Sequence, residues 1–435
     1  MSATAAAVFW DLVEESLGEA SFLWEMREAA LVAPDRTPVE VEAAIEERLR
    51  GAIEGLTVPG ADIAGRLLAP ALASDEWPAV AVAAHALLAG GTAAGRDQFC
   101  AAFREARGRS LEALRRGLEL ASTGDLWVAL GQEMAGADPE VQAAFLEARA
   151  FRGLPFGAPD AQWLSPSAHP GLQRGAARLL RHVPPSSSAG WLPQALALSD
   201  PAARRRAIET GLILGERVAW ALCRDQAEAA GAGRGQALLA VAILGTERDH
   251  DRLTAMLGDP RWQREAIWAL GFGGRRAGAD ACLDLLAQDQ QPRLAAEAFS
   301  AITGLDLREA DLAVAPPPEP EDQPAGEKDV VLDAEGALPL ADVAGVIRWW
   351  NRQRPRFEAG VRYLGGRPIT LGCLGDALLH GPMRRRRPLA FELAVRTQGR
   401  VQVETGAFLA EQRRRLSAVD WQPGARRADT SAILD

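Results

Sequence analysis

The sequence predicts an all-α fold in which pairs of helices repeat along the chain as a solenoid. Ala, Leu, Glu and Arg, which are strong helix formers, dominate long tracts, and the chain has a single tyrosine among few strand formers. An Asp-Pro pair that precedes an Ala-rich amphipathic pattern recurs along the chain, at Asp138-Pro139, Asp200-Pro201 and Asp259-Pro260. Glycines then end successive patterns at intervals of 30, 26 and 33 residues, near the interval of about 30–45 residues typical of helical solenoids. These glycines are Gly215, Gly245, Gly271 and Gly304.

Residues 1–60 are expected to form an acidic helical cap on the array. They carry twelve acidic residues and four arginines, a net charge of −8. Apolar residues recur at roughly helical intervals, at Phe9, Leu12, Leu17, Phe22 and Trp24. Gly18 predicts a break in this helix, and Thr37-Pro38 predicts the start of a second one that reaches about Leu56. The acidic run is typical of a solvated helix face, and an acidic docking surface is the alternative.

Two arrays are predicted after the cap. The first array and a hinge span residues 61–170, where four prolines between 154 and 170 indicate a long loop. The second array spans residues 171–310 and contains a further interruption at 184–190. Within each unit, the Asp would cap the helix and the Pro would occupy its first turn.

The repeat is clearest over residues 253–304. Two helices are predicted there, Pro260 to Leu270 and Pro292 to Ile302, ended in a left-handed conformation by Gly271 and Gly304. Small residues, Ala266 and Ala298, would let the helices approach closely. Larger ones would fill the layer between units, namely Leu257, Ile267, Leu270 and Phe299.

A Pro- and acid-rich linker (311–340) leads to an Arg-rich C-terminal helical module (341–435). Residues 344–427 contain seventeen arginines against six acidic residues, a net charge of +11, although the whole chain carries −10. The module would dock on the acidic array within the chain or bind an acidic protein partner. The candidate partner-binding residues are Arg384, Arg385, Arg386, Arg387, Arg413, Arg414 and Arg415. Nearby aromatic residues leave single-stranded nucleic acid open as an alternative, which the overall acidity disfavours. They are Trp349, Trp350, Phe357 and Tyr363.

Motifs for catalysis or metal binding are missing from the sequence. Five histidines and four cysteines are scattered singly, without an HExxH or CxxC pattern, and no GxSxG motif is present. The glycines of Gly271–Gly278 follow a predicted helix, so they indicate a turn between units and not a phosphate-binding loop. We therefore expect no catalytic residue, no metal and no cofactor. Without a signal-peptide or membrane-span pattern, we expect a cytoplasmic protein without a membrane partner.

Four stretches, taken in order, resemble a bacterial family of HEAT-repeat-like proteins of uncharacterised activity, often encoded beside type VI secretion genes. The first three are Glu14–Pro34, Trp268–Gly274 (WALGFGG) and Ala295–Leu307 (AAEAFSAITGLDL). The fourth has the form WW…RF..G.RYL.GRP.T, here Trp349, Trp350, Arg356, Phe357, Gly360, Arg362, Tyr363, Leu364, Gly366, Arg367, Pro368 and Thr370. The resemblance implies HEAT-like units in both arrays and a cytosolic accessory of a secretion apparatus.

The function expected is a non-enzymatic protein-interaction scaffold, because helical arrays expose extended surfaces. The resemblance implies an adaptor or chaperone that loads a secretion effector or a spike component. An immunity protein that neutralises a cognate effector is one alternative. A helical-repeat enzyme acting on nucleic acid or a cofactor is the other, and it would need a cluster of ionisable groups with shifted pKa values.

Overall fold

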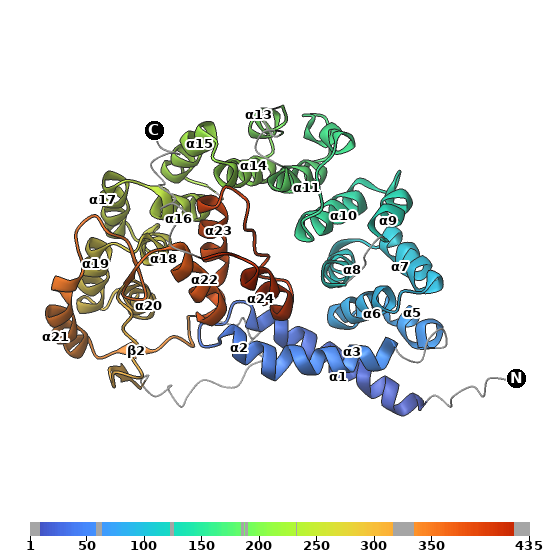
Figure 1. The fold of residues 1–435 in the computed structure, drawn as a ribbon, viewed down its shortest axis with the longest axis horizontal. Coiled ribbons are helices and arrows are strands. Elements are labelled where there is room, and N and C mark those ends of the chain that lie inside the picture. The colour runs from blue at the N-terminus through green and yellow to red at the C-terminus, as the bar shows by residue number, and fades with distance from the viewer. Residues whose placement is uncertain are drawn as a thin grey trace, which may run out of the picture. The chain divides into compact units, whose positions relative to one another are not determined.

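A computed structural model describes residues 9–57, 63–121, 126–183, 187, 190–231, 233–315 and 335–421. This part of the chain is all-α, with two short two-stranded sheets (Figure 1). Most of the predicted linker, residues 316–334, and most of the predicted interruption at 184–190 lie outside the described residues. Among the helices of the described residues, none is both long and apolar enough to cross a membrane.

The contacts group the chain into two compact units. Unit 1 comprises residues 1–31, 38–215 and 403–418, and unit 2 comprises residues 32–37, 216–402 and 419–435. The boundary at Gly215 falls inside the predicted second array, and residues 403–418 of the predicted C-terminal module belong to unit 1. The chain therefore leaves unit 1, forms most of unit 2, and returns to unit 1 near its end.

The elements of unit 1 follow one another in short helices. They are α1 (Trp10–Ala30), α2 (Pro38–Val41), η1 (Glu42–Glu46), α3 (Glu47–Thr57), η2 (Ala64–Leu68), α5 (Ala69–Ala71), α6 (Trp77–Ala89), α7 (Ala93–Glu105), α8 (Gly108–Leu120), α9 (Leu126–Met134), α10 (Pro139–Phe151), η3 (Ala158–Leu164), α11 (Pro170–Leu179), η4 (Leu180–His182), α13 (Leu192–Leu196), α14 (Pro201–Leu214) and, after the return, α24 (Leu409–Ser417). One layer runs α1, α6, α8, α10, α11, α14, each packed on the next. Flanking elements α7, α9, η3 and α13 pack on α6, α10, α11 and α14.

Unit 2 continues the same alternation and adds a C-terminal module. Its elements are α15 (Arg217–Glu228), α16 (Arg234–Leu244), α17 (Glu247–Ala255), η5 (Met256–Gly258), α18 (Gln263–Gly273), α19 (Arg276–Ala287), α20 (Pro292–Thr303), β1 (Ala313–Val314), β2 (Leu340–Ala341), α21 (Val343–Gln353), η6 (Arg354–Arg356), β3 (Tyr363–Leu364), β4 (Arg367–Pro368), α22 (Leu371–His380), η7 (Met383–Arg385) and α23 (Arg386–Arg396). Helices α16, α18 and α20 pack in series, and α15, α17 and α19 flank them. Both sheets are antiparallel pairs, β1 with β2 and β3 with β4.

Two of the predicted Asp-Pro helix starts are confirmed. Asp138 accepts a hydrogen bond from the Glu140 N–H (2.9 Å) at the start of α10. Asp200 accepts one from the Ala203 N–H (2.7 Å) at the start of α14. In both helices the proline follows in the first turn, where a missing N–H leaves no intrahelical bond unmade. Gly215 then ends α14 with a φ of 82°.

The third start was predicted wrongly, because α18 begins at Gln263 and not at Pro260. The Asp259 carboxylate accepts a hydrogen bond from the Arg261 backbone N–H (3.0 Å) and also pairs with the Arg261 guanidinium. These two contacts hold residues 259–262 in a turn. The predicted stop at Gly271 is also wrong. Gly271 lies inside the helix, where an added Cβ would sit 3.1 Å from the Cα of Ala298 on α20, so it permits close helix packing.

Helix α1 runs unbroken through Gly18, contrary to the predicted break. Its buried face also differs from the predicted one, since Phe9, Leu12 and Phe22 are more than half exposed. The residues that α1 buries are Val13, Ala20, Leu23, Trp24, Arg27 and Ala30. This face includes an arginine, which an apolar pattern cannot reveal.

The C-terminal module caps two repeat helices of unit 2. Gly274 and Gly304, both with positive φ, end α18 and α20. The Gly274 carbonyl accepts the Tyr363 N–H (2.7 Å) at the start of β3. The N–H groups of Gly365 and Gly366 donate to Ala301 and Ile302 at the end of α20 (2.8 and 3.0 Å). The β3–β4 turn thus supplies hydrogen-bond donors to carbonyl groups that otherwise lack partners at the C-terminus of a helix.

Arg362 reinforces the same arrangement, because its guanidinium donates to the Phe272 and Gly273 carbonyls (2.8 and 2.9 Å). A Cβ on Gly274 would lie 2.4 Å from the Tyr363 oxygen, and one on Gly304 2.6 Å from that of Gly365. Three of the motif stretches, which lie far apart in the sequence, therefore meet at one place in unit 2.

Buried aromatic residues join the module to the array. Trp350, Phe357 and Tyr363 lie in one apolar cluster with Phe299 and Ile302 of α20. The Trp350 indole N–H donates to Asp280 (2.8 Å). These three aromatic side chains are at most 5% exposed, so they are core residues and offer no stacking surface for bases.

Replacing Phe299 with alanine tests this packing. The side chain is 1% exposed and contacts the rings of Trp349 and Trp350. We expect Phe299→Ala to lower the free energy of unfolding by about 3–5 kcal/mol, through lost burial and the cavity left behind. Val218→Ala on α15, where the side chain is 61% exposed, is the control and should change stability little. Equal thermal midpoints for the two variants would contradict the packing assignment.

Candidate interaction surface

The run Arg384–Arg387 lies in unit 2 and its members differ in exposure. Arg384 stacks over Trp268 and Arg385 over Phe272, with guanidinium carbons 4.7 and 4.0 Å from the ring centroids. Arg385 also donates to the Gly271 carbonyl (2.9 Å), and the buried Arg386 donates to that of Leu378 (2.8 Å). For Arg384 and Arg385 the structure thus shows docking within the chain.

Of this run, Arg387 alone is exposed. Arg413, Arg414 and Arg415 lie on α24 in unit 1, and the first two are exposed. Arg413 pairs with Glu42 (2.5 Å) and Arg415 with Glu411 (3.0 Å). Partner binding by these seven arginines stays a prediction, and burial removes Arg385 and Arg386 from any surface open to a partner in this conformation.

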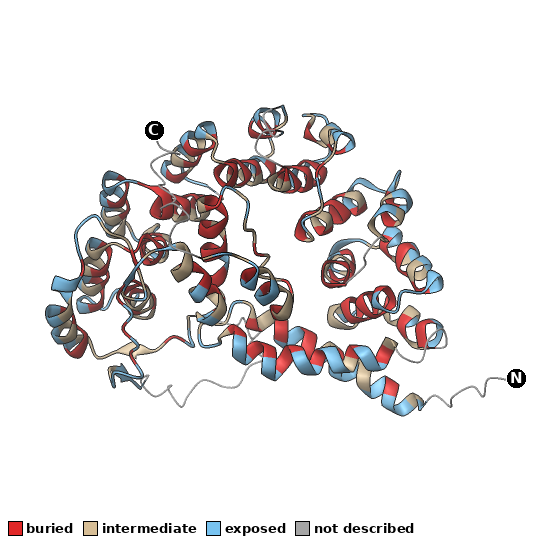
Figure 2. Cartoon of the chain, in the orientation of Figure 1, coloured by how far each residue is buried: buried red, intermediate tan, exposed pale blue. Residues whose placement is uncertain are grey.

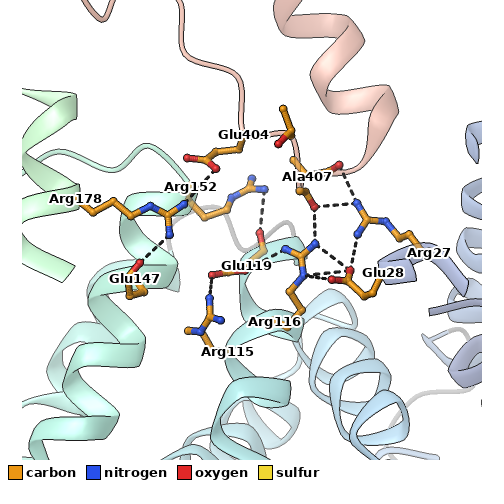
Figure 3. A network of polar contacts seen from close by, with 12 residues as sticks. Arg27, Glu28, Arg115, Arg116, Glu119, Glu147, Arg152, Arg178, Glu404 and Ala407 are labelled. Atoms are coloured by element: carbon orange, nitrogen blue, oxygen red, sulfur yellow. Dashed lines mark hydrogen bonds and ion pairs between the residues drawn. The ribbon is translucent and has the colours of Figure 1, made fainter. Parts of the chain in front are cut away.

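A different cluster of arginines gathers around residues 403–418, which we call the strap. The strap begins as an irregular segment with a turn, in which the Ala407 N–H donates to the Glu404 carbonyl (2.9 Å), and continues into α24, both packed within unit 1 (Figure 2). Arginines from five elements of unit 1 contact the strap, namely Arg27 on α1, Arg116 on α8, Arg152 at the end of α10, Arg178 on α11 and Arg181 on η4. Figure 3 shows the first four of them. We call these five arginines the strap-binding surface.

Two of these arginines hold the backbone of the strap. Arg27 donates to the carbonyls of Gly406 and Ala407 (2.9 and 2.8 Å). Arg116 donates to the Gly406 carbonyl as well (2.6 Å). A Cβ added to Gly406 would lie 3.3 Å from the Arg116 guanidinium, so this position of the strap favours glycine. Contacts to main-chain carbonyls recognise the backbone of the strap with little regard to its side chains.

The other three arginines bind the acidic side chains of the strap. Arg178 contacts the Glu404 carboxylate (3.2 Å), and Arg181 pairs with the same group. Arg152 pairs with Glu411 on α24 (3.1 Å). At the side chains of these five residues, exposure is 12–19%, so water screens the pairs less than on an open surface.

Carboxylates within unit 1 neutralise the same arginines from the other side. Glu28 accepts hydrogen bonds from both Arg27 (2.7 Å) and Arg116 (3.0 Å). Glu46 accepts from Arg27 (2.8 Å), and Glu119 accepts from Arg116 (3.1 Å). Burial raises the pKa of Glu28, but the two guanidinium groups outweigh it and hold that pKa below its ordinary value.

Glu147 shows the same balance beside Arg178, because its carboxylate accepts a hydrogen bond from the Arg178 guanidinium (2.8 Å). Burial opposes its ionisation, yet Arg178 keeps the pKa of Glu147 below the ordinary value. Glu28 and Glu147 are therefore ionised near neutral pH, and each fixes the position of an arginine before any strap contact is counted.

His85 closes the network on its apolar side. Its ring makes edge contacts with Trp24 and with Phe408 of the strap, at centroid distances of 5.8 Å. Burial lowers the pKa of His85 to about 4, and lowers those of His182 and His250 to about 3. Those histidines are neutral at pH 7.

Sequence reasoning missed the strap-binding surface because its members lie far apart in the sequence. Arg27 and Arg178, for example, are 151 residues apart, and each member has the sequence context of an ordinary solvated arginine. The one signal available was the first motif stretch, which contains Trp24, Arg27 and Glu28. Among the described residues, no group of three or more His, Cys, Asp or Glu side chains is arranged to hold a metal ion.

No protein-family model matches the chain, and no curated protein sequence matches it.

Removing Arg116 tests the charge balance of this surface. Arg116→Ala leaves the buried Glu119 and the partly buried Glu28 with one cation fewer, so we expect a loss of about 3–5 kcal/mol in the free energy of unfolding. Arg109→Ala, an exposed arginine on the same helix, is the matched control. Denaturant titration measures the free energy of unfolding of both variants. Equal values would show that the charge of Arg116 does not stabilise the fold.

The depressed histidines predict a pH dependence of stability. Between pH about 6.5 and about 4 the unfolded chain protonates these histidines and the folded chain does not, so the unfolded state binds more protons. The free energy of unfolding should therefore fall as pH is lowered from 7 to 5, by about 1.4 kcal/mol per pH unit for each proton taken up.

His85→Leu should reduce the slope of the free energy of unfolding against pH by the contribution of about one proton, about 1.4 kcal/mol per pH unit, whatever its effect on stability at pH 7. The comparison is made by denaturant titration of both chains at several pH values. An unchanged slope would mean that His85 titrates normally in the folded chain.

Proposed function

We propose that the chain is a non-enzymatic protein-interaction scaffold that binds a turn-forming segment of a protein partner. One observation carries the proposal: several elements of unit 1 present arginines that already hold a turn of polypeptide, by its carbonyls and its carboxylates. Helical arrays provide such a surface because each repeat adds one contact along a line.

The wider role rests on the resemblance of the motif stretches. Under that resemblance the chain is an adaptor or chaperone that loads a type VI secretion effector or a spike component. The contacts of unit 1 suit this role because main-chain recognition accepts segments of different sequence. That the repeat units of the chain are HEAT-like is part of the same proposal.

Catalysis is given no part in the proposal. The shifted carboxylates and histidines of the network have pKa values away from neutrality: those of Glu28 and Glu147 lie below the ordinary value, and those of His85 and His182 lie at about 4 and about 3. A general acid or base works best with a pKa near the operating pH. The same groups are suited to holding fixed charges in place.

Affinity purification of the tagged chain from its own cells tests the proposal. We expect an effector or a spike component to be enriched over a tagged, unrelated control, as read by mass spectrometry. Recovery of only the chain itself and general chaperones would contradict the proposal.

Deletion of the coding gene separates the adaptor from the immunity alternative. Loss of an adaptor should abolish secretion of one effector and leave the cells resistant to their siblings. Loss of an immunity protein should instead make the cells sensitive. Sensitivity with normal secretion would replace the adaptor role with the alternative.

A further inference from the structure

The strap has the character of a bound ligand within unit 1. The residues before it, 216–402, belong to unit 2, so its departure would remove no other element of unit 1. Left-handed residues precede it, Gln398 with a φ of 50° and Gly399 with a φ of 75°. The chain therefore reaches the strap through a turn and not through a continuous helix.

The strap-binding surface keeps a carboxylate partner for its main cations when the strap is set aside. Arg27 retains Glu46 and Glu28, and Arg116 retains Glu28 and Glu119. Such internal pairs would hold the guanidinium groups in place and limit the desolvation penalty of an empty surface. The surface is pre-organised, which lowers the cost of binding a new chain.

The strap itself contributes few buried side chains. Of the side chains between 403 and 408, Val403 and Ala407 alone are buried, and Glu404 has its ion pairs with Arg178 and Arg181. The surface thus specifies a turn that begins at a carboxylate, with a glycine two positions later and an aromatic residue two positions after that. In the strap this aromatic residue is Phe408, which lies against Arg27 and His85.

We propose that the strap-binding surface of unit 1 is the receptor for an acidic, turn-forming segment of a partner protein, and that the strap occupies this receptor until such a segment displaces it. This inference rests on the proposed function and names the part of the partner that is recognised. Charge complementarity commits it to a carboxylate-bearing peptide, because Arg178 and Arg181 flank that position.

The probe for the test is a fluorescein-labelled peptide with the sequence of residues 400–418. It is titrated against the full-length chain and against full-length Glu404→Arg, in which like charges oppose Arg178 and Arg181. An attached strap competes at an effective concentration in the millimolar range. We therefore expect the apparent Kd by fluorescence anisotropy to be at least about tenfold lower for Glu404→Arg than for the wild type.

Matched controls accompany both partners. Glu358→Arg makes the same charge reversal at an exposed acidic residue of unit 2 and should behave as the wild type. Peptides carrying Glu404→Arg or Gly406→Val should bind Glu404→Arg chain at least about tenfold more weakly, since they lose the carboxylate or crowd Arg116. Equal binding of all three peptides would overturn the assigned chemistry.

Hydrogen exchange over residues 403–408 completes the test. Exposure of these residues in Glu404→Arg without peptide binding would overturn the receptor. Unchanged protection would overturn the role of Glu404 in holding the strap. Where Glu404→Arg fails to fold by circular dichroism, Glu404→Gln takes its place, with a smaller shift in the same direction expected.

Light scattering identifies the occupant. If the wild-type chain dimerises at concentrations where the peptide dissolves the dimer, a second copy's strap is the occupant and the partner segment is refuted. Failure of the peptide test with a partner still recovered from cells would leave the scaffold proposal standing and remove this inference alone.

Discussion

The pairing of Arg27 and Arg116 with the strap carbonyls is the interaction on which unit 1 depends. Both guanidinium groups are enclosed, Arg27 at 0% and Arg116 at 11% side-chain exposure, and a buried cation needs partners for its donors. The carboxylates of Glu28, Glu46 and Glu119 supply charge, and the strap supplies neutral acceptors in the remaining positions. Polar groups that are each satisfied by the others fix one arrangement more sharply than apolar packing would.

Unit 2 solves a related problem with hydrogen-bond donors. There the β3–β4 turn and Arg362 donate to carbonyls at the ends of α18 and α20, which helix geometry leaves without partners. In both units, then, a segment from late in the chain bonds to elements that lie far before it. The difference is in the chemistry, since the capping turn satisfies backbone groups that would otherwise lack partners and the strap contacts side chains that have other partners. This difference is the physical reason for assigning displacement to the strap and not to the turn.

How much was predictable follows from the range of each interaction. Helix caps are local, so Asp138, Asp200 and Gly304 could be read from neighbouring residues. Gly271 was misassigned because its role, close approach to Ala298, depends on a helix that begins more than twenty residues later. Phe9, Leu12 and Phe22 were taken for a buried face since a pattern of apolar residues does not report which helix faces which.

The strap-binding surface lay beyond sequence reasoning for the same reason. Its arginines come from five elements, and their common target, the strap, comes from residues 403–418. The Arg-rich run at 384–387 drew attention instead because its members are adjacent, yet two of them are buried inside unit 2. Contacts between residues hundreds of positions apart leave no local pattern to find.

The central claim is that a partner segment replaces the strap on unit 1. Hydrogen exchange on the full-length chain, alone and in complex with its purified partner, measures this most directly. The account predicts that residues 403–408 lose protection in the complex while α8, α10 and α11 keep theirs. Protection of 403–408 that is unchanged or increased by the partner would contradict it.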